Sequence, residues 1–236
     1  MPKLTLAAII PCLNEEATIA SVVEGLRARG VQRVIVADNG SHDASAANAL
    51  QAGAEVVHEP RRGYGSACLR AMRVLEASAP DAVLFCDGDG ADDLNDVSLL
   101  EHVLVHQGAD IVVGSRSRGP REPGALLPQA RVGNAIATLW IRALTGVAFT
   151  DLGPLRLVRW PALIALQMDD PDYGWTVQMQ LRAARRGLRC AEIPVRYKRR
   201  RGGTSKVSAN LRGSVLAGVT ILRVLGRETV AGWRRT

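Results

Sequence analysis

Four carboxylates follow an apolar run in the stretch "VLFCDGDGADD", residues 83–93. They are Asp87, Asp89, Asp92 and Asp93, and no basic residue lies among them. Negative charge concentrated in this way repels itself unless a cation lies within it. Mg²⁺ and Mn²⁺ prefer oxygen ligands, and Mg²⁺ typically uses one or two carboxylates together with phosphate oxygens. We therefore predict that Asp87 and Asp89 hold a divalent cation that also binds a nucleotide diphosphate.

Calcium binding and helix capping are the other interpretations of this stretch. An EF-hand loop needs an acidic or amide residue at its fifth position, Gly at its sixth and Glu at its twelfth. This chain has Ala91, Asp92 and Ser98 at those positions, so the calcium interpretation fails. Capping remains for Asp92 and Asp93, which we predict to form a turn and the start of the following helix.

Strands and helices alternate in the first half of the chain, and this alternation positions the acidic stretch. Apolar runs predict strands at 4–10, 33–38, 55–59, 82–87 and 110–115, and amphipathic segments predict helices at 16–29, 43–52, 65–78 and 95–107. The pattern predicts an α/β fold with a mixed, mostly parallel sheet and helices on both faces. Ligands bind beyond the carboxyl ends of such strands, so "PCLNEE", "ADNGSHD" and "CDGDGADD" should lie on one rim.

The pattern changes after residue 116. A loop rich in Gly, Pro and Arg precedes a predicted helix near 129–145, and then come "FTDLGPLRLV", a helix around 174–186, a strand in "CAEIPVRY" and the basic loop "KRRRGGTSK".

A chain of 236 residues with 47% hydrophobic residues suits a single domain. The four cysteines are scattered along the chain and lack the spacing of metal ligands. We therefore expect them to be core residues of a protein in a reducing cytoplasm. We expect the apolar segment "LTLAAII" near the N-terminus to be a strand and not part of a signal peptide.

Charge is distributed unequally between the two halves. Residues 1–115 carry 8 Lys or Arg against 16 Asp or Glu, a net charge of −8, whereas residues 116–236 carry 22 against 7, a net charge of +15. An acidic half suits a bound cation, and a basic half suits a phosphate-bearing partner or an anionic membrane surface. Nucleic acid is not expected as a partner, because the chain has only nine aromatic residues and no aromatic array that would stack bases.

The segment 210–236 is predicted to be an amphipathic C-terminal helix. Its apolar face would comprise Leu211, Val215, Val219, Leu222, Leu225 and Trp233, beside a sector of arginines. Only ten uncharged residues lie between Arg212 and Arg223, fewer than the about 20 that a membrane span needs. The helix would either lie on an anionic membrane surface or pack on its own domain, and the sequence leaves both interpretations open.

Eight motifs occur in the order seen in family 2 glycosyltransferases. They are "IIPCLNEEATI", "VADNGSHDAS", "RRGYGSACLRAM", "FCDGDGADD", "VVGSR", "TDLGPLR", "YGWTVQMQ" and "RRRGGTSKVS". The chain resembles this family over roughly residues 5–215, and most of all the branch of polyprenyl (dolichyl) phosphate sugar synthases. The resemblance implies a single domain of GT-A type, with a nucleotide-sugar-binding half (1–115), an acceptor-binding half (116–209) and the C-terminal helix (210–236).

The resemblance also implies which residues form the site. The nucleotide sugar would be bound by Pro11, Leu13, Asn14, Glu15, Asp38, Gly63 and Gly65. The metal ligands would be Asp87 and Asp89, with Asp89 counted as catalytic. The donor and acceptor phosphates would be held by Arg116, Arg131, Arg200, Ser205 and Lys206. The branch often carries a further polar ligand where this chain has Gly90 and Ala91, and Asp92 or water are the candidates to replace it.

Position 178 departs from the family pattern. Related sequences usually carry a carboxylate there, whereas Gln178 cannot abstract a proton. A phosphate acceptor resolves this conflict, because its second pKa of about 6 leaves it mostly ionised near pH 7. We expect Gln178 to contact substrate, Asp151 to orient the sugar or the acceptor, and Arg200 to act beside Asp151 and Asp89 as a catalytic residue.

The leading hypothesis is an inverting, Mg²⁺- or Mn²⁺-dependent transfer of a hexose from a UDP- or GDP-sugar to a polyprenyl phosphate. The enzyme would be cytoplasmic and peripherally associated with the cytoplasmic membrane. Two alternatives remain: a glycosyltransferase with a soluble hydroxyl acceptor, which would need a base, and a degenerate, non-catalytic protein that binds nucleotide sugars. Assembly into a homo-oligomer stays open.

Overall fold

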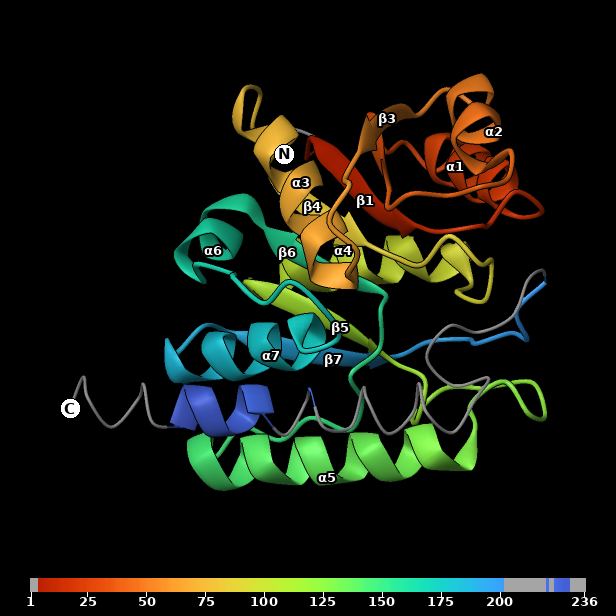
Figure 1. Ribbon diagram of the computed structural model, residues 1–236. Helices are drawn as coiled ribbons and strands as arrows, with labels where there is room; N and C mark the ends of the chain where they lie inside the picture. Colours follow the sequence, from red (N-terminus) through yellow and green to blue (C-terminus); the bar gives the residue numbers. More distant parts are fainter. Residues whose placement is uncertain (1–3, 202–219, 221–222, 230–236) are drawn as a thin grey trace.

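A seven-stranded sheet extends through both the acidic and the basic half of the chain (Figure 1). The computed structural model describes residues 4–201, 220 and 223–229. In sheet order the strands are β3 (Glu55–His58), β2 (Arg33–Asp38), β1 (Leu6–Cys12), β4 (Ala82–Phe85), β6 (Arg156–Arg159), β5 (Ile111–Ser115) and β7 (Cys190–Pro194). All neighbours pair in parallel except β6, which is antiparallel to β4 and β5. The predicted mixed, mostly parallel sheet is confirmed.

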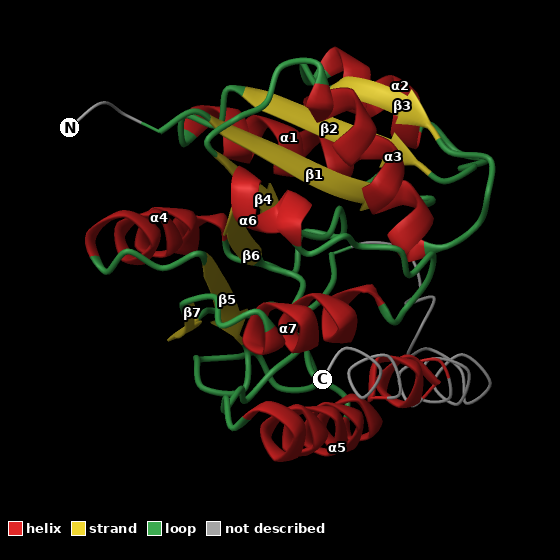
Figure 2. Cartoon of the chain, turned by 90° about the vertical axis from the view of Figure 1, so that its left-hand side faces the viewer, coloured by secondary structure: helices red, strands yellow, loops and turns green. Residues whose placement is uncertain are grey.

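Helices cover both faces of this sheet (Figures 1 and 2). One face carries α1 (Ile19–Ala28), α2 (Ser45–Gln51) and α4 (Val97–His106), the last preceded by the short 3₁₀ helix η1 (Leu94–Asp96). The other face carries α3 (Tyr64–Glu76), α6 (Trp160–Ala165) and α7 (Trp175–Arg185), with α5 (Pro128–Thr145) packed beside α7. The helix layers on both faces exclude water from the sheet, which explains the nearly continuous apolar strands.

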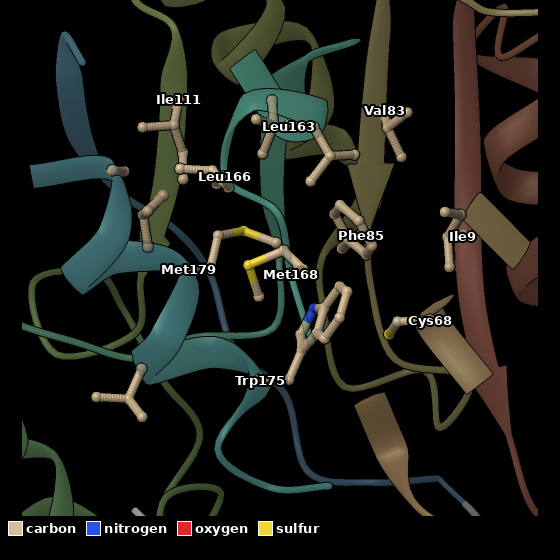
Figure 3. Close-up of a cluster of buried hydrophobic side chains, with 14 of the residues drawn as sticks. Ile9, Cys68, Val83, Phe85, Ile111, Leu163, Leu166, Met168, Trp175 and Met179 are labelled. Atoms are coloured by element: carbon tan, nitrogen blue, oxygen red, sulfur yellow. The ribbon is translucent and has the colours of Figure 1, made fainter. Parts of the chain in front are cut away.

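Strand β4 carries the acidic stretch and is anchored from both sides. Its residues alternate between the two cores, with Val83 and Phe85 on the α3 and α7 side and Leu84 on the opposite side. The Phe85 ring packs against the Trp175 ring, with 6.1 Å between centroids and 57° between planes (Figure 3). A tilted aromatic pair of this kind adds to the energy of burial. The end of β4 is therefore held rigidly at the point where the carboxylates begin.

Strand β6 and helix α6 are the elements that sequence analysis did not predict. β6 has only four residues, Arg-Leu-Val-Arg, and so lacks an apolar run long enough to recognise. Because β6 runs against its neighbours, its first residue, Arg156, pairs with Phe85 at the last residue of β4. The residues that precede β6, including Asp151, consequently reach the same rim as the ends of β4 and β5.

The helical residues 223–229 pack on the rest of the domain. Val224 and Leu225 are buried and belong to the same core as Trp175. Val224 fits over Gly174 so closely that a Cβ there would lie 2.4 Å from the Val224 Cγ2. For these residues the structure shows packing on the domain, and apart from Thr220 the remainder of the predicted helix 210–236 lies outside the described residues. In the described part of the chain, no helix combines the length and apolar character required to span a bilayer.

Candidate functional site

The loops that follow β1, β2 and β4 meet at one edge of the sheet, as its parallel register requires. The Thr18 hydroxyl, after β1, donates a hydrogen bond to the Gly88 carbonyl, after β4, at 2.7 Å. The Asn14 backbone N–H donates to the Ser41 hydroxyl, after β2, at 3.0 Å. The three segments predicted to share a rim therefore do so.

Asp87 and Asp89 lie at this rim within range of each other's charge. The Tyr64 hydroxyl donates to Asp87 Oδ1 at 3.3 Å, and the Ala91 N–H donates to Asp89 Oδ1 at 2.9 Å. Gly90, with φ of 71°, supplies the left-handed turn that follows them. Burial, and then the charge of Asp89, raise the pKa of Asp87 to about 7. Two carboxylates that repel in this way are the arrangement that a divalent cation stabilises.

The two remaining carboxylates of the stretch have different surroundings. Asp93 accepts a hydrogen bond from the Asn95 N–H at 3.1 Å and pairs with Lys198 Nζ at 3.2 Å, so the predicted cap is confirmed for Asp93. Asp92 is 6% exposed, and its Oδ2 accepts from the Asp87 N–H at 3.3 Å. Burial and the charges of Asp87 and Asp89 raise the pKa of Asp92. The predicted cap is therefore wrong for Asp92, which belongs to the carboxylate cluster.

The donor set suits a divalent cation that the protein coordinates only in part. Among the described residues, no three His, Cys, Asp or Glu side chains are gathered so that they could hold an ion by themselves. Mg²⁺ commonly takes one or two carboxylates and completes its shell with water and phosphate. Asp92 Oδ1 is buried and accepts no hydrogen bond from the described residues, which is a cost that a nearby ion and its waters would relieve.

Arg200 joins the loop after β1 to the acidic stretch. Its guanidinium pairs with the Glu15 carboxylate through Nη2, and its Nη1 lies 3.6 Å from Asp89 Oδ2. The basic loop after β7 therefore reaches the rim where a diphosphate and its cation are predicted. Two further predicted residues of this loop, Ser205 and Lys206, lie outside the described residues.

Arg116 and Asp151 form a buried ion pair between the end of β5 and the segment before β6. Arg116 Nε and Nη2 donate to the two Asp151 oxygens, both at 2.8 Å. The carboxylate also accepts from the backbone N–H groups of Arg116 and Leu152, both at 2.8 Å, and from the Asn134 amide. Burial opposes its ionised form, but Arg116 holds the pKa of Asp151 below its usual value. Five donors occupy this carboxylate, so it orients Arg116 and is poorly placed to accept a proton.

Asp38 lies at the end of β2, where a nucleoside contact is predicted. Its Oδ1 accepts from the Ser41 N–H at 3.1 Å, and its Oδ2 lies 3.2 Å from His58 Nδ1. Burial opposes ionisation, but the hydrogen bonds from Ser41 and His58 lower the pKa of Asp38. Asp38 is thereby fixed as an ionised acceptor. His58 was not predicted, because a lone histidine at the end of a strand carries no pattern.

The other predicted residues take separate positions. Pro11 lies in β1 beside Ala37, and Leu13 is half-buried directly after that strand. Asn14 has φ of 51° and accepts a hydrogen bond from the His42 N–H at 2.9 Å. Arg131 is exposed near the start of α5. Contacts of these residues with donor or acceptor remain predictions.

Gly63 and Gly65 allow a loop from the second half of the chain to reach α3. A Cβ on Gly63 would lie 2.2 Å from the Pro171 carbonyl oxygen, and one on Gly65 would lie 2.0 Å from the Asp170 carbonyl oxygen. The Ser66 N–H donates to the Pro171 carbonyl at 2.8 Å. The close approach that these glycines permit is thus to the protein's own backbone, and their contact with a nucleotide remains a prediction.

Gly65→Ala is expected to lower the free energy of unfolding by about 1–3 kcal/mol, because the new methyl group would overlap the Asp170 carbonyl. Gly133→Ala is the matched control, since Gly133 also lies in a helix and has no atom within 4 Å of an added Cβ. The control should be neutral or stabilise by up to about 1 kcal/mol. Urea denaturation measures both changes, and equal stabilities would contradict the proposed contact.

Gln178 uses its whole hydrogen-bonding capacity inside the protein. Its Oε1 accepts from the N–H groups of Asp169 and Asp170 at 3.1 and 3.0 Å. Its Nε2 donates to Asp169 Oδ1 at 2.7 Å and to Glu228 Oε1 at 3.0 Å. A glutamine amide offers two donors and two acceptor positions, and all four are occupied. The structure therefore gives Gln178 a structural role in place of the predicted contact with substrate.

Gln178→Glu is expected to destabilise the protein by about 1–3 kcal/mol, because a carboxylate would replace the amide that donates to Asp169 and Glu228. Adding Glu228→Gln returns a donor to the cluster and should recover part of the loss. Melting temperatures of the wild type, both single variants and the double variant provide the comparison. Losses that simply add would show that the two side chains do not interact.

Three further residues contribute to the rim without having been predicted. Tyr64 donates to Asp87, and the Tyr197 ring centroid lies 5.1 Å from the Arg116 guanidinium, within range of a cation–π contact. Arg156 is 1% exposed, and burial lowers its pKa to about 10. Tyr64 and Arg156 lie inside motifs used for the family resemblance, but nothing in the sequence marked them as site residues. Tyr64 and Tyr197 are single aromatic residues, and Arg156 lies in a strand that was not predicted.

Comparison with known sequences gives these residues a family context. The family model described as "Glycosyl transferase family 2" matches residues 7–156. An uncharacterized glycosyltransferase of Mycobacterium tuberculosis is 38% identical over 219 residues, which cover 92% of this chain and 96% of that protein. The undecaprenyl-phosphate mannosyltransferase of Micrococcus luteus is 31% identical over 228 residues, which cover 90% of this chain and 91% of that protein.

Solved structures resemble the fold along most of its length. Glucosyl-3-phosphoglycerate synthase of Mycobacterium tuberculosis, in complex with Mn²⁺, UDP-glucose and phosphoglyceric acid, matches with a TM-score of 0.71 and 25% sequence identity. The match covers 94% of this chain and 80% of that chain. The GT-A type fold implied by the motifs is thereby confirmed.

Proposed function

The chain belongs to glycosyl transferase family 2, and on that basis we propose that it transfers a hexose from a nucleotide diphosphate sugar to a polyprenyl phosphate. It is accordingly an enzyme, a glycosyltransferase. The half comprising residues 1–115 would bind the donor, and the half comprising residues 116–209 would bind the acceptor. The intact Asp87 and Asp89 pair at the rim speaks against a degenerate binding protein.

The donor would lie over the ends of β1, β2 and β4. Asp38 offers an ionised acceptor to the hydroxyl or N–H groups of a nucleoside. Asp87 and Asp89 would hold Mg²⁺ or Mn²⁺, which when bound supplies charge neutralisation to the departing diphosphate. Arg200, beside Asp89, would add positive charge on the same side. The complex of the related structure with Mn²⁺ and UDP-glucose supports this proposal.

The proposal of a phosphate acceptor rests on the hydrogen bonds that already occupy the Asp151 and Gln178 side chains. A hydroxyl acceptor would need a base, yet Asp151 is held by five donors and Gln178 is saturated and cannot accept a proton. A phosphate monoester is already mostly ionised near pH 7. Its oxygen would attack the anomeric carbon while the bond from that carbon to the diphosphate breaks on the opposite face. Arg116, fixed by Asp151, would position the attacking phosphate.

Helix α5 supports an acceptor that carries a lipid. Four large apolar side chains of this helix are 36–67% exposed: Val132, Ile136, Leu139 and Trp140. They recur at the spacing of one helix face, and Arg131 lies at the start of the same helix. An exposed apolar stripe beside a basic residue suits a helix that lies on an anionic membrane surface. We propose peripheral association with the cytoplasmic membrane face on this basis.

Product partitioning tests the proposed function. Purified full-length protein with Mn²⁺ and radiolabelled UDP- or GDP-hexoses is given polyprenyl phosphate in one series and phosphoglyceric acid in another. Label is expected in an acid-labile, organic-extractable product only when polyprenyl phosphate is present. Label that appears only in aqueous product would contradict the lipid acceptor. It would instead favour a soluble acceptor, a candidate that the related complex with phosphoglyceric acid supports.

A further inference from the structure

The Asp92 carboxylate carries a buried oxygen whose purpose the proposed function leaves unexplained. Asp92 is 6% exposed, and its Oδ2 accepts from the Asp87 N–H at 3.3 Å. Its Oδ1 is buried and has no hydrogen-bond partner among the described residues. A buried carboxylate oxygen left without a partner is costly, and native proteins rarely retain one without a function. The oxygen therefore points to a donor that binds at the rim.

Nearby protein groups are committed to other partners. Asp93, and not Asp92, caps the helix that follows. Arg200 pairs with Glu15 and Asp89, and Arg116 pairs with Asp151. Among the described residues no donor is left for Asp92 Oδ1, and a bound species that satisfies it next to three carboxylates has to be positively charged or polarised by a positive ion.

The shape of the cluster indicates how that species reaches Asp92. In the part of the chain that the structure describes, no three acidic or other metal-ligating side chains are placed to bind one ion together. In the proposed function Asp87 and Asp89 would supply the direct contacts, and the Ala91 side chain is a methyl group that cannot coordinate. An ion held by two carboxylates keeps several waters, and outer oxygen acceptors orient such waters.

We propose that Asp92 is a positioning residue for the cation: its Oδ1 accepts a hydrogen bond from a water bound to the ion that Asp87 and Asp89 hold. This inference rests on the metal use in the proposed function and adds a third carboxylate to it. Asp92 fixes the orientation of the ion-bound water and, through Oδ2 and the Asp87 N–H, fixes the backbone of a metal ligand as well.

Mn²⁺ binding to the full-length protein tests this role without any activity measurement. Free Mn²⁺ is titrated by its electron paramagnetic resonance signal, and the waters on bound Mn²⁺ are counted by water proton relaxation. Asp92→Asn keeps an acceptor for the Asp87 N–H but replaces the unpartnered oxygen by a donor. It is expected to bind Mn²⁺ about 10–100-fold more weakly than wild type, with an unchanged number of bound waters. The neighbouring Asp93→Asn is the matched control and should bind within about twofold of wild type.

Stability separates this role from a structural one. Asp92→Asn removes one of three repelling carboxylates, so the metal-free variant should unfold at the same or a higher urea concentration than wild type while binding Mn²⁺ less well. Asp92→Ala serves as a second variant and should show the same loss of affinity. Wild-type affinity in folded Asp92→Asn and Asp92→Ala would overturn the proposal. One additional water on Mn²⁺ in either variant would overturn it too, because it would mean that Asp92 binds the ion directly.

Mn²⁺ binding also distinguishes a failure of the proposed function from a failure of the role of Asp92. If wild-type protein itself does not bind Mn²⁺ in the presence of UDP, the metal-dependent mechanism fails together with the role of Asp92. If wild type binds and Asp92→Asn binds equally well, the role of Asp92 fails alone, and the roles of Asp87 and Asp89 stand.

Discussion

Asp89→Asn is expected to lower the rate of hexose transfer by on the order of 10²–10³-fold while leaving the fold intact. The substitution removes the charge that would bind the cation and that attracts Arg200, whose Nη1 lies 3.6 Å away. Asparagine retains the oxygen that accepts from the Ala91 N–H, so the turn should survive. Steady-state transfer from the preferred nucleotide sugar at saturating Mn²⁺ measures the effect.

Asp93→Asn provides the control for Asp89→Asn. Asp93 caps η1 and pairs with Lys198, so its replacement should lower the melting temperature slightly and preserve most of the transfer rate. If both variants lost the same fraction of activity, the acidic stretch would act as a whole and Asp89 would have no particular role. If Asp89→Asn retained wild-type activity, the metal argument would be wrong.

Asp151→Asn is expected to lower the free energy of unfolding by about 3–5 kcal/mol at pH 7. Asp151 is fully buried, and its replacement would leave the buried Arg116 guanidinium without the carboxylate that it is hydrogen-bonded to. Replacement of Glu55 by Gln is the control, because the Arg33–Glu55 pair has the same 2.8 Å separation but is partly exposed. That change should cost no more than about 1 kcal/mol. Urea denaturation of both variants compares a buried pair with an exposed one.

The stability that Asp151 provides should depend on pH in a defined direction. Its folded-state pKa is lowered, so the folded protein holds the ionised form at pH values where the unfolded chain takes up a proton. The contribution is therefore fully present above the unfolded value of about 3.9 and is lost as pH falls through the folded pKa. The difference between wild type and Asp151→Asn should be constant from pH 6 to 8 and shrink below about pH 4. A difference that grew on acidification would exclude the ion pair as its source.

The architecture was predictable wherever local pattern and chain order decide it. The run at 33–38 is a buried strand and the run at 82–87 contains one, Ala82–Phe85, and their parallel order is sufficient to bring the segments after them to one rim. β6 was not predicted, because a four-residue strand that begins and ends with arginine has no recognisable strand pattern. Its pairing with the neighbouring strands makes it a strand. Its reversed direction, which brings Asp151 to the rim, is a property of the assembled sheet.

The residues of the candidate site also differ in how well the sequence predicted their contacts. The cap at Asp93 depends on a residue two positions away and was predicted correctly. By contrast, Gln178 is satisfied by Glu228, 50 residues along the chain, and Gly65 accommodates the backbone of Asp170. Those contacts exist only after the chain has folded, so the residue types alone could not predict them.

The antiparallel pairing of β5 with β6 has a consequence for how the enzyme could change its acceptor. The chain leaves the sheet after Ser115 and re-enters it at Arg156, and Arg116 and Asp151, which lie between these two points, form an ion pair with each other. Everything between them, including α5, is an excursion whose two ends are joined at its base. Because Ala137 and Ile141 of α5 belong to the core beside α7 and Asn134 donates to Asp151, an exchanged segment must keep these contacts. We expect chimaeras with residues 117–150 taken from a relative to fold and to acquire that relative's acceptor preference.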